Sequence, residues 1–551
     1  MSSTHPGRVR RAAVTLTAAS TVRGGAAVLA GTAAIALHGA RFGNWIVDDA
    51  AITFAYTRSF ATGEGPVLQP GAEPVEAFSN PTWLALLWLG RLVGLFDRGT
   101  IFGIPDQVLY PKALALLCCM GILVACYRAA RVVSGRPALV TLVTGLGLAA
   151  VPSFVIWCFS GLENALFALF VAVLAATLCR AAVADRLDAP RVAVAAGLLA
   201  AGAALTRPDG AAYVVALPLL VVVWLPPGQA VRQTLVSLGV FAVPYGAYVL
   251  WRFLTFGHLL SAPAIAKGQE PPDVETLMRV GEVVTYAGAL AALVLAVSVG
   301  LVLTRPSPLR TGVIALLVPL GLAIASHAVL MPDWMGQLRF TTPVWPLAAL
   351  VGTLAVGEAL ARLAPRGRIV LAAGLAVALV PSLVTFRTAS DRFSAGPTVP
   401  MCRIAERYGE MFDAYADRLG VEQGTLLLPD IGGTALTSRL EVIDLAGLAS
   451  YRIARLRGAG DMAGLRNHVF EESRPTFIHT HGAWDAGMSA DPRLTRDYFW
   501  LYRGEGTDSD WVRRDVADEG DVAALRTYAA RTVAEQRGDG PKRHCTQTYD
   551  R

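Results

Sequence analysis

Asn44-Trp45-Ile46-Val47-Asp48-Asp49-Ala50-Ala51-Ile52-Thr53-Phe54-Ala55-Tyr56 is the stretch that decides how the rest of the chain is interpreted. Its two adjacent carboxylates, Asp48 and Asp49, closely follow an apolar run at 24–42 that is long enough to cross a membrane. Neighbouring acids repel each other and are costly close to hydrocarbon, so a membrane protein places them there for a task more often than for stability. The alternative is an acidic interfacial loop that only marks the outer face of a transporter or a scaffold.

The 551-residue chain has the composition of a membrane protein. Hydrophobic residues make up 54% of it and charged residues 16%, against roughly 25% charged residues in ordinary soluble domains. The apolar character is concentrated before residue 387, and polar residues become frequent after it. We therefore predict a polytopic α-helical membrane domain over 1–387, with a first outer loop at 43–107, and a water-exposed α/β domain over 388–551.

A transmembrane helix needs roughly 20 apolar residues. Eleven segments are expected to span the membrane: 24–42, 108–127, 138–156, 162–181, 191–206, 211–225, 233–251, 281–303, 311–331, 341–361 and 369–387. A further apolar run, 81–96, is interpreted as a helix lying in the outer interface. If it spanned the membrane, the arginines of the 128–136 loop would fall outside, against the positive-inside rule. The same rule places the N-terminus inside and the C-terminal domain outside.

This topology gathers polar residues from distant parts of the chain at the outer ends of the helices. The net charge of +6 does not indicate nucleic acid, because the basic residues lie in short loops where they set topology. The outer loops contain Asp48, Asp49, Arg58, Glu76, Asn80, Glu163, Arg207, Asp209, His258, Lys267, Asp333 and Arg339. Such convergence predicts a functional site on the outer face.

Sugar transfer outside the cell sets chemical requirements that these residues meet. No nucleotide sugar is available there, so a polyprenyl-phosphate sugar is the usual donor. The reaction needs a carboxylate that takes the acceptor proton or stabilises charge at the sugar carbon, and Asp48 and Asp49 are the candidates. It also needs cations for the departing phosphate. The candidates for that role are Lys267, Arg339, Arg207, Arg58 and His258.

Each candidate also has a structural alternative. Lys267 can place its charge at the membrane interface, and Arg339 can pair with Asp333. Arg207-Pro208-Asp209-Gly210 fits a tight turn between two helices, and Glu163 can cap the helix that follows it. Two short buried strands that end in turns are predicted at 424–433 and 440–448, and a third strand at 477–481. His479 and His481 alternate on one face of that third strand. Since the sequence shows no third ligand beside them, they are interpreted as satisfied polar residues rather than metal ligands.

Seven motifs follow one another along the chain: Asp48-Asp49-Ala50-x-Ile52-Thr53, Ala61-Thr62-Gly63-x-Gly65, Glu76-x-Phe78-Ser79-Asn80-Pro81-x-Trp83, Gly161-Leu162-Glu163, Thr206-Arg207-Pro208-Asp209-Gly210, Asp333-Trp334-Met335 and Val442-Ile443-Asp444-Leu445-Ala446-Gly447-Leu448. Their order resembles that of polyprenyl-phosphate-sugar glycosyltransferases of the GT-C class. Within that class it is most similar to the actinobacterial terminal β-(1→2) arabinofuranosyltransferases of cell-wall arabinan. In such enzymes the first-loop aspartates are essential, which implies a catalytic role for Asp48 and Asp49.

The resemblance implies a donor, an acceptor and a location. The donor would be decaprenyl-phosphoryl arabinose, and the acceptor the arabinan of arabinogalactan or lipoarabinomannan. The protein would lie in the cytoplasmic membrane with its site and C-terminal domain on the outer side. Many members of the class bind a divalent ion near the acidic motif, so Asp48, Asp49 and Glu76 are candidate metal ligands. The alternatives are transfer of another prenyl-phosphate sugar, such as mannose, or transport of a lipid or sugar.

Two cysteines in the predicted outer domain are expected to form a disulfide. Cys402 and Cys545 lie near the two ends of that domain, and domain termini often lie close together. Disulfides persist outside the cytoplasm. We therefore predict a bridge that ties the C-terminal tail to the start of the domain, with two unrelated free thiols as the alternative.

Overall fold

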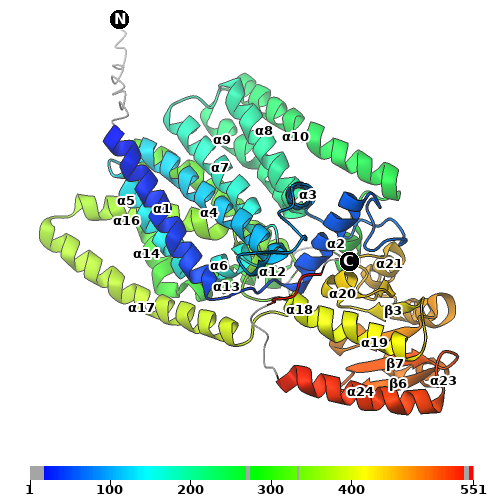
Figure 1. Cartoon of the computed structure of the whole chain (residues 1–551). Helices are drawn as coiled ribbons and strands as arrows, with labels where there is room; N and C mark the ends of the chain where they lie inside the picture. The colour runs from blue at the N-terminus through cyan, green and yellow to red at the C-terminus, as the bar shows by residue number, and fades with distance from the viewer. Residues whose placement is uncertain (1–17, 269–272, 332–333, 539–544, 550–551) are drawn as a thin grey trace, which may run out of the picture.

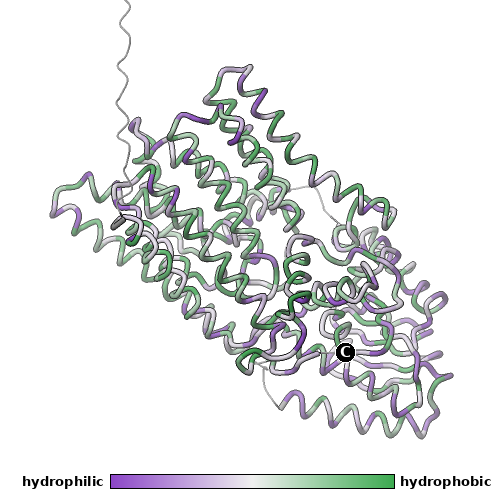
Figure 2. The backbone as a smooth tube through the Cα atoms, turned by 45° about the horizontal axis from the view of Figure 1, so that its top comes forward, coloured by the Kyte–Doolittle hydropathy of each residue, from purple (hydrophilic) through white to green (hydrophobic). Residues whose placement is uncertain are grey.

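The computed structural model describes residues 18–268, 273–331, 334–538 and 545–549. A bundle of long helices forms one part, and a mixed α/β region lies at one end of it (Figure 1). Figure 2 shows that hydrophobic residues dominate the helices of the bundle, whereas polar residues are frequent throughout the α/β region. This division follows the change in composition along the sequence.

Helices cover each of the eleven predicted spans. Among the described residues, seven helices are long and apolar enough to cross a membrane: α1 (Ala18–Ala40), α4 (Asp106–Val133), α7 (Asn164–Val183), α10 (Pro227–Phe256), α15 (Pro308–Val329), α16 (Val344–Arg362) and α17 (Pro365–Ala395). Two bent pairs of helices reach this length and apolar character only when each pair is taken together, as a broken span or a re-entrant loop: α5 (Pro137–Ala150) with α6 (Pro152–Cys158), and α12 (Val274–Met278) and α13 (Val280–Ala287) with α14 (Ala289–Leu303). Two segments are shorter: α8 (Pro190–Thr206), and η1 (Pro208–Val215) with α9 (Ala216–Trp224). The chain is thus a polytopic helical protein, as predicted.

Proline and glycine mark where these helices begin and bend. Proline occupies the first turn of α5, α8, α10, α15 and α17, where its missing N–H has no helical partner to lose. Pro152 begins α6 after an 82° bend from α5. Gly288 joins α13 to α14 with a φ of 92°, a backbone conformation that other residues rarely adopt.

The first loop contains two helices and a small hairpin. Helix α2 (Asp48–Thr62) begins at the acidic pair, and α3 (Pro81–Leu92) occupies most of the apolar run 81–96. At 12 residues α3 is about 18 Å long, too short to cross a hydrocarbon core of about 30 Å. Strands β1 (Thr100–Ile101) and β2 (Ile104–Pro105) precede α4. The run 81–96 is therefore not a membrane span.

A five-stranded sheet organises the C-terminal region, in the order β4-β3-β5-β7-β6. Its strands are β3 (Thr425–Leu428), β4 (Glu441–Asp444), β5 (Phe477–Thr480), β6 (Tyr498–Arg503) and β7 (Ser509–Arg513). Strand β3 pairs in parallel with β4 and β5, while β7 is antiparallel to β5 and β6. The surrounding helices are α18 (Met401–Ile404), α19 (Met411–Arg418), α20 (Ile431–Thr437), α21 (Tyr451–Gly458), α22 (Met462–Asn467), α23 (Pro492–Asp497) and α24 (Glu519–Gly538). The three strands predicted near 424–433, 440–448 and 477–481 correspond to β3, β4 and β5.

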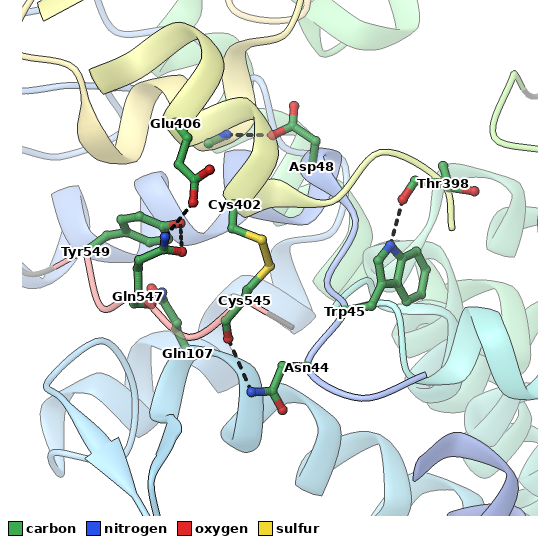
Figure 3. Close-up of a disulfide and its surroundings, with 11 residues drawn as sticks. Asn44, Trp45, Asp48, Gln107, Thr398, Cys402, Glu406, Cys545, Gln547 and Tyr549 are labelled. Atoms are coloured by element: carbon green, nitrogen blue, oxygen red, sulfur yellow. Dashed lines mark hydrogen bonds between the residues drawn. A yellow bond between two sulfur atoms is a disulfide. The ribbon is translucent and has the colours of Figure 1, made fainter. Parts of the chain in front are cut away.

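The chain crosses from the bundle to the sheet region over a short linker and returns through its tail. Helix α17 continues past the predicted boundary at 387 and ends at Ala395, close to the start of α18. Cys402 of α18 and Cys545 of the tail form a disulfide, with Cα atoms 5.5 Å apart (Figure 3). The tail also contacts the bundle side, because the Asn44 amide donates to the Cys545 carbonyl and the Gln107 amide donates to the Gln547 carbonyl.

Candidate functional site

Five of the predicted site residues line one cavity of about 70 Å³ next to α2: Asp49, Asn80, Glu163, Lys267 and Arg339. They come from α2, the loop before α3, the turn before α7, the end of α11 (Ala262–Lys267) and the 3-10 helix η2 (Arg339–Thr341). Thr53, Ser79 and apolar residues, among them Phe78, Leu162 and Leu448, complete the lining. The structure therefore brings together polar groups from segments that are far apart in the sequence.

A hydrogen-bonded network fixes the acidic wall of the cavity. The Asn80 amide donates to Glu163 Oε2 at 2.8 Å, and Arg207 Nη1 donates to Glu163 Oε1 at 3.1 Å. Arg207 Nε in turn donates to Asp209 Oδ1 at 2.9 Å. Arg207 therefore holds Glu163 in place, and neither Arg207 nor Asp209 lines the cavity. A phosphate-binding role for Arg207 does not fit this arrangement.

Two cations face the acidic wall. Lys267 ends α11 and is exposed, whereas the Arg339 side chain is 8% exposed. The Arg339 guanidinium lies over the Phe340 ring at 5.2 Å and the Trp157 ring at 6.0 Å, contacts that hold a positive charge against aromatic faces. Two carboxylates, Asp49 and Glu163, and two cations consequently surround the same small space.

The backbone before Arg339 adopts an uncommon conformation. Gly336, Gln337 and Leu338 all have positive φ angles of 69°, 49° and 51°, and two of them are not glycine. Neighbouring groups hold this turn in place: Trp157 Nε1 donates to the Gln337 carbonyl at 3.0 Å, and the Thr398 hydroxyl donates to the Met335 carbonyl at 3.2 Å. Tertiary contacts therefore set the position of the buried arginine.

The two acids of the first motif face different surroundings. Asp49 is partly exposed and lines the cavity. Asp48 is buried and accepts hydrogen bonds from the backbone N–H groups of Gly433 and Gly432 at 2.7 and 3.2 Å, at the start of α20. Burial, together with the negative charge of Asp430, raises the pKa of Asp48 well above its ordinary value. Asp48 therefore joins α2 to the C-terminal region, and of the two acids only Asp49 lines the cavity.

Glycine is required where Asp48 meets α20. A Cβ at Gly432 would collide with the Asp48 backbone carbonyl oxygen, and one at Gly433 would collide with the Met401 carbonyl oxygen. The Gly-Gly pair is visible in the sequence, but its acidic partner lies more than 380 residues away. The sequence therefore indicated a turn and did not reveal its partner.

Glu76 does not join the acidic pair. Its side chain is fully buried and binds Arg252 and the Tyr248 hydroxyl of α10. Burial raises its pKa, although Arg252 opposes the shift. Because its carboxylate is occupied by these partners, a divalent ion shared by Asp48, Asp49 and Glu76 does not fit this arrangement. Sequence analysis did not identify Arg252 as the partner of Glu76. The one signal in the sequence was a single arginine directly after the apolar run 233–251.

The remaining predicted residues lie outside the cavity lining or outside the described residues. Arg58 donates to the Ala435 and Leu436 carbonyls of α20 at 3.0 and 3.2 Å, so it contacts the C-terminal region rather than a phosphate. His258 stacks on the Tyr451 ring at 4.0 Å. Neither position suits the phosphate-binding role considered for these residues. Asp333, a candidate site residue that was also considered as a partner of Arg339, lies outside the described residues.

Comparison with solved structures identifies the class of fold. No family model and no curated protein matches this sequence. The chain is similar to ArnT from Cupriavidus metallidurans in the apo state, with a TM-score of 0.59, 15% sequence identity, and coverage of 92% of this chain and 99% of ArnT. The same enzyme bound to undecaprenyl phosphate gives a TM-score of 0.57 at the same identity and coverage. The mycobacterial arabinofuranosyltransferase AftD is 15% identical with a TM-score of 0.49, covering 90% of this chain and 40% of AftD.

The architecture is that of the GT-C fold. The fold class implied by the motifs is thereby confirmed.

Proposed function

We propose that this protein is a membrane glycosyltransferase that uses a polyprenyl-phosphate sugar as donor. One observation carries the proposal: Asp49, Lys267 and Arg339 line the same cavity. In the reaction, the acceptor hydroxyl attacks the anomeric carbon of the sugar, the bond between that carbon and the phosphate oxygen breaks, and the phosphate stays on the lipid. The GT-C fold supports the same class, and ArnT with this fold has been solved with undecaprenyl phosphate bound.

Each part of the cavity has a role in this chemistry. Asp49 takes the acceptor proton, which requires an ionised carboxylate within hydrogen-bonding reach of the hydroxyl. Lys267 and Arg339 bind the phosphate and stabilise the charge that develops on it as the bond breaks. Asn80 and Glu163, held by Arg207, offer hydrogen-bonding groups to the sugar hydroxyls.

The motif resemblance supports a narrower proposal. The donor is decaprenyl-phosphoryl arabinose, and the acceptor is the arabinan of arabinogalactan or lipoarabinomannan. The cavity faces the outer side of the cytoplasmic membrane, and the C-terminal region, over 388–551, helps to hold the polysaccharide beside it. The arginines of the cytoplasmic loops favour this orientation.

A cell-free transfer assay tests the class and the sugar separately. Purified protein is incubated with a synthetic arabinan acceptor and radiolabelled prenyl-phosphate arabinose, with prenyl-phosphate mannose and other prenyl-phosphate sugars in parallel. We expect transfer of arabinose, loss of transfer in Asp49→Asn, and retention in Asp391→Asn. Asp391 provides a matched control because it forms an exposed ion pair with Arg41. Transfer of another sugar alone would overturn the arabinose assignment, and no transfer from any donor would overturn the class.

A further inference from the structure

Two histidines and an aspartate gather at one edge of the C-terminal sheet, outside the cavity. Asp430 follows β3, His479 lies in β5, and His481 directly follows β5. Strands β3 and β5 are adjacent and parallel, so their carboxyl ends meet at the same edge. One ligand atom from each of the three side chains lies within 4.8 Å of the others, and the described part of the chain contains no second group of this kind.

His479 presents a buried nitrogen to this cluster. Its side chain is fully buried, and Nδ1 lies 2.7 Å from Asp510 Oδ1. Because Arg407 lies 3.0 Å from Asp510 and favours its ionised form, Nδ1 carries the proton and donates it, leaving a lone pair on Nε2. No described residue offers Nε2 a hydrogen bond. Leaving a buried polar atom without a partner destabilises the folded state by about 1–3 kcal/mol, and a ligand bound to this nitrogen would remove that cost.

The surroundings of His479 hold that nitrogen in one direction. Histidines that bind metals almost always donate their other ring N–H to a carboxylate, carbonyl or water, which fixes the tautomer and the ring orientation. Asp510 has this role here, and the Tyr415 hydroxyl bonds to its second oxygen at 3.2 Å. The Tyr408 ring packs against the His479 imidazole with a centroid distance of 4.3 Å. The outer support of a metal-binding histidine is therefore in place.

The other two side chains complete a site that is open on one side. His481 Nε2 lies 2.7 Å from Asp430 Oδ2, and the two side chains are 33% and 20% exposed. Solvent can therefore reach the cluster past His481 and Asp430. The nearby carboxylates of Asp430, Asp508 and Asp510 outweigh the one guanidinium of Arg407, so the local charge favours a cation.

We propose that Asp430, His479 and His481 bind a divalent transition-metal ion of the Zn²⁺ class, with solvent at a fourth position. Two imidazoles and one carboxylate suit Zn²⁺, whereas Ca²⁺ and Mg²⁺ prefer oxygen ligands alone. Asp430 immediately precedes α20, whose Gly432 and Gly433 N–H groups hold Asp48. The ion ties β5 to the turn that anchors α2, and so stabilises the contact between the sheet and the acidic motif.

Metal content of the intact protein tests the site without an activity assay. Full-length protein is purified in detergent with an affinity tag that contains no histidine, stripped with chelator, and equilibrated with ZnCl₂. Elemental analysis should find one Zn²⁺ per chain, and Zn K-edge X-ray absorption should report two imidazole ligands. Adding Zn²⁺ to the stripped protein should raise the temperature of unfolding.

Matched variants assign the ion to these residues. His481→Gln and Asp430→Asn should each weaken Zn²⁺ binding at least tenfold, while His468→Gln should bind it as the wild type does. His468 is a suitable control because it also pairs with a carboxylate, Glu472, at 2.8 Å in the same region. Wild-type protein that binds no Zn²⁺, or equal binding by wild type, His481→Gln and Asp430→Asn, would overturn the proposal. If both variants fail to fold, the wild-type absorption spectrum decides, and a spectrum without two imidazole ligands would also overturn it.

Discussion

The cavity and the C-terminal sheet region receive one acid each from the same two-residue motif. Asp49 faces the cavity with Lys267 and Arg339, whereas Asp48 turns away and binds the backbone of α20. Successive residues at the start of a helix point about 100° apart, so neighbouring acids need not share a task. The two acids of the motif therefore have different surroundings: Asp49 lines the cavity, and Asp48 binds the C-terminal region.

Replacing the acid in the cavity should have the largest effect on activity. We expect Asp49→Asn to lower the transfer rate by about 10²–10⁴-fold, the usual contribution of a positioned general base. The temperature of unfolding should stay near that of the wild type, because Asp49 is partly exposed. Transfer assays and thermal unfolding of the same preparation measure both. Wild-type turnover in this variant would place the base elsewhere.

Replacing the acid at the α20 contact should instead destabilise the protein. Asp48→Ala leaves the N–H groups of Gly432 and Gly433 buried without their acceptor, at a cost of about 1–3 kcal/mol. Thermal unfolding should therefore distinguish Asp48→Ala from Asp49→Ala, with only the first clearly lowered. Equal unfolding temperatures would remove the distinction between the two acids.

Replacing the two cations of the cavity, Lys267 and Arg339, should have a smaller effect on transfer than replacing Asp49. Lys267→Met and Arg339→Met should each weaken donor binding or slow transfer by about tenfold or more, since charge-assisted hydrogen bonds are worth roughly 1.5–3 kcal/mol. Arg58→Met is the matched control, because Arg58 also follows the acidic motif but contacts α20. Titration of the donor should leave its affinity for Arg58→Met unchanged. A loss in Arg58→Met equal to that in Lys267→Met would mean that the cavity does not hold the phosphate.

The smallest expected effect concerns pH and the sheet region. Burial raises the pKa of Asp444 to about 6 from an ordinary value of 3.8, against the opposing effect of hydrogen bonds from the Ala449 and Ala446 N–H groups. Between these values the folded protein binds a proton that the unfolded chain does not, so this group's contribution to stability falls as pH rises through 6. Asp444→Asn should flatten the pH dependence of unfolding in that window. An unchanged profile would show that Asp444 does not titrate there.

The sequence predicted the parts of the molecule that depend on apolar length and on charge position. The helices of the bundle follow from the apolar runs, and among the described residues seven of them, or nine if each bent pair is one span, are long and apolar enough to cross a membrane. The positive-inside rule predicts from the order of the loops that Asp49, Glu163, Lys267 and Arg339 lie on one face of the membrane, and the structure places these side chains around one cavity. Asn80 was recognised through its motif.

Other contacts join residues that are far apart in the sequence, and the residue types alone do not show which of them pair. Backbone N–H donors hold Asp48, and backbone groups carry no signature in the sequence. The aromatic run of β6, Tyr498–Arg503, was not predicted as a strand, because it lacks the alternation of polar and apolar residues. The third candidate ligand beside His479 and His481 follows β3, and only the parallel pairing of β3 with β5 brings Asp430 to them.

The linker between the helical bundle and the sheet region contacts the turn before Arg339, and so it helps to position a side chain of the cavity. Left-handed backbone costs about 1–2 kcal/mol for a residue other than glycine, and Gln337 and Leu338 both adopt it. Thr398 restrains that turn by bonding to Met335, while its own carbonyl accepts from Trp45, three residues before the acidic motif. A shift of the linker is therefore transmitted to both ends of the cavity at once, to the helix that carries Asp49 and to the turn that positions Arg339.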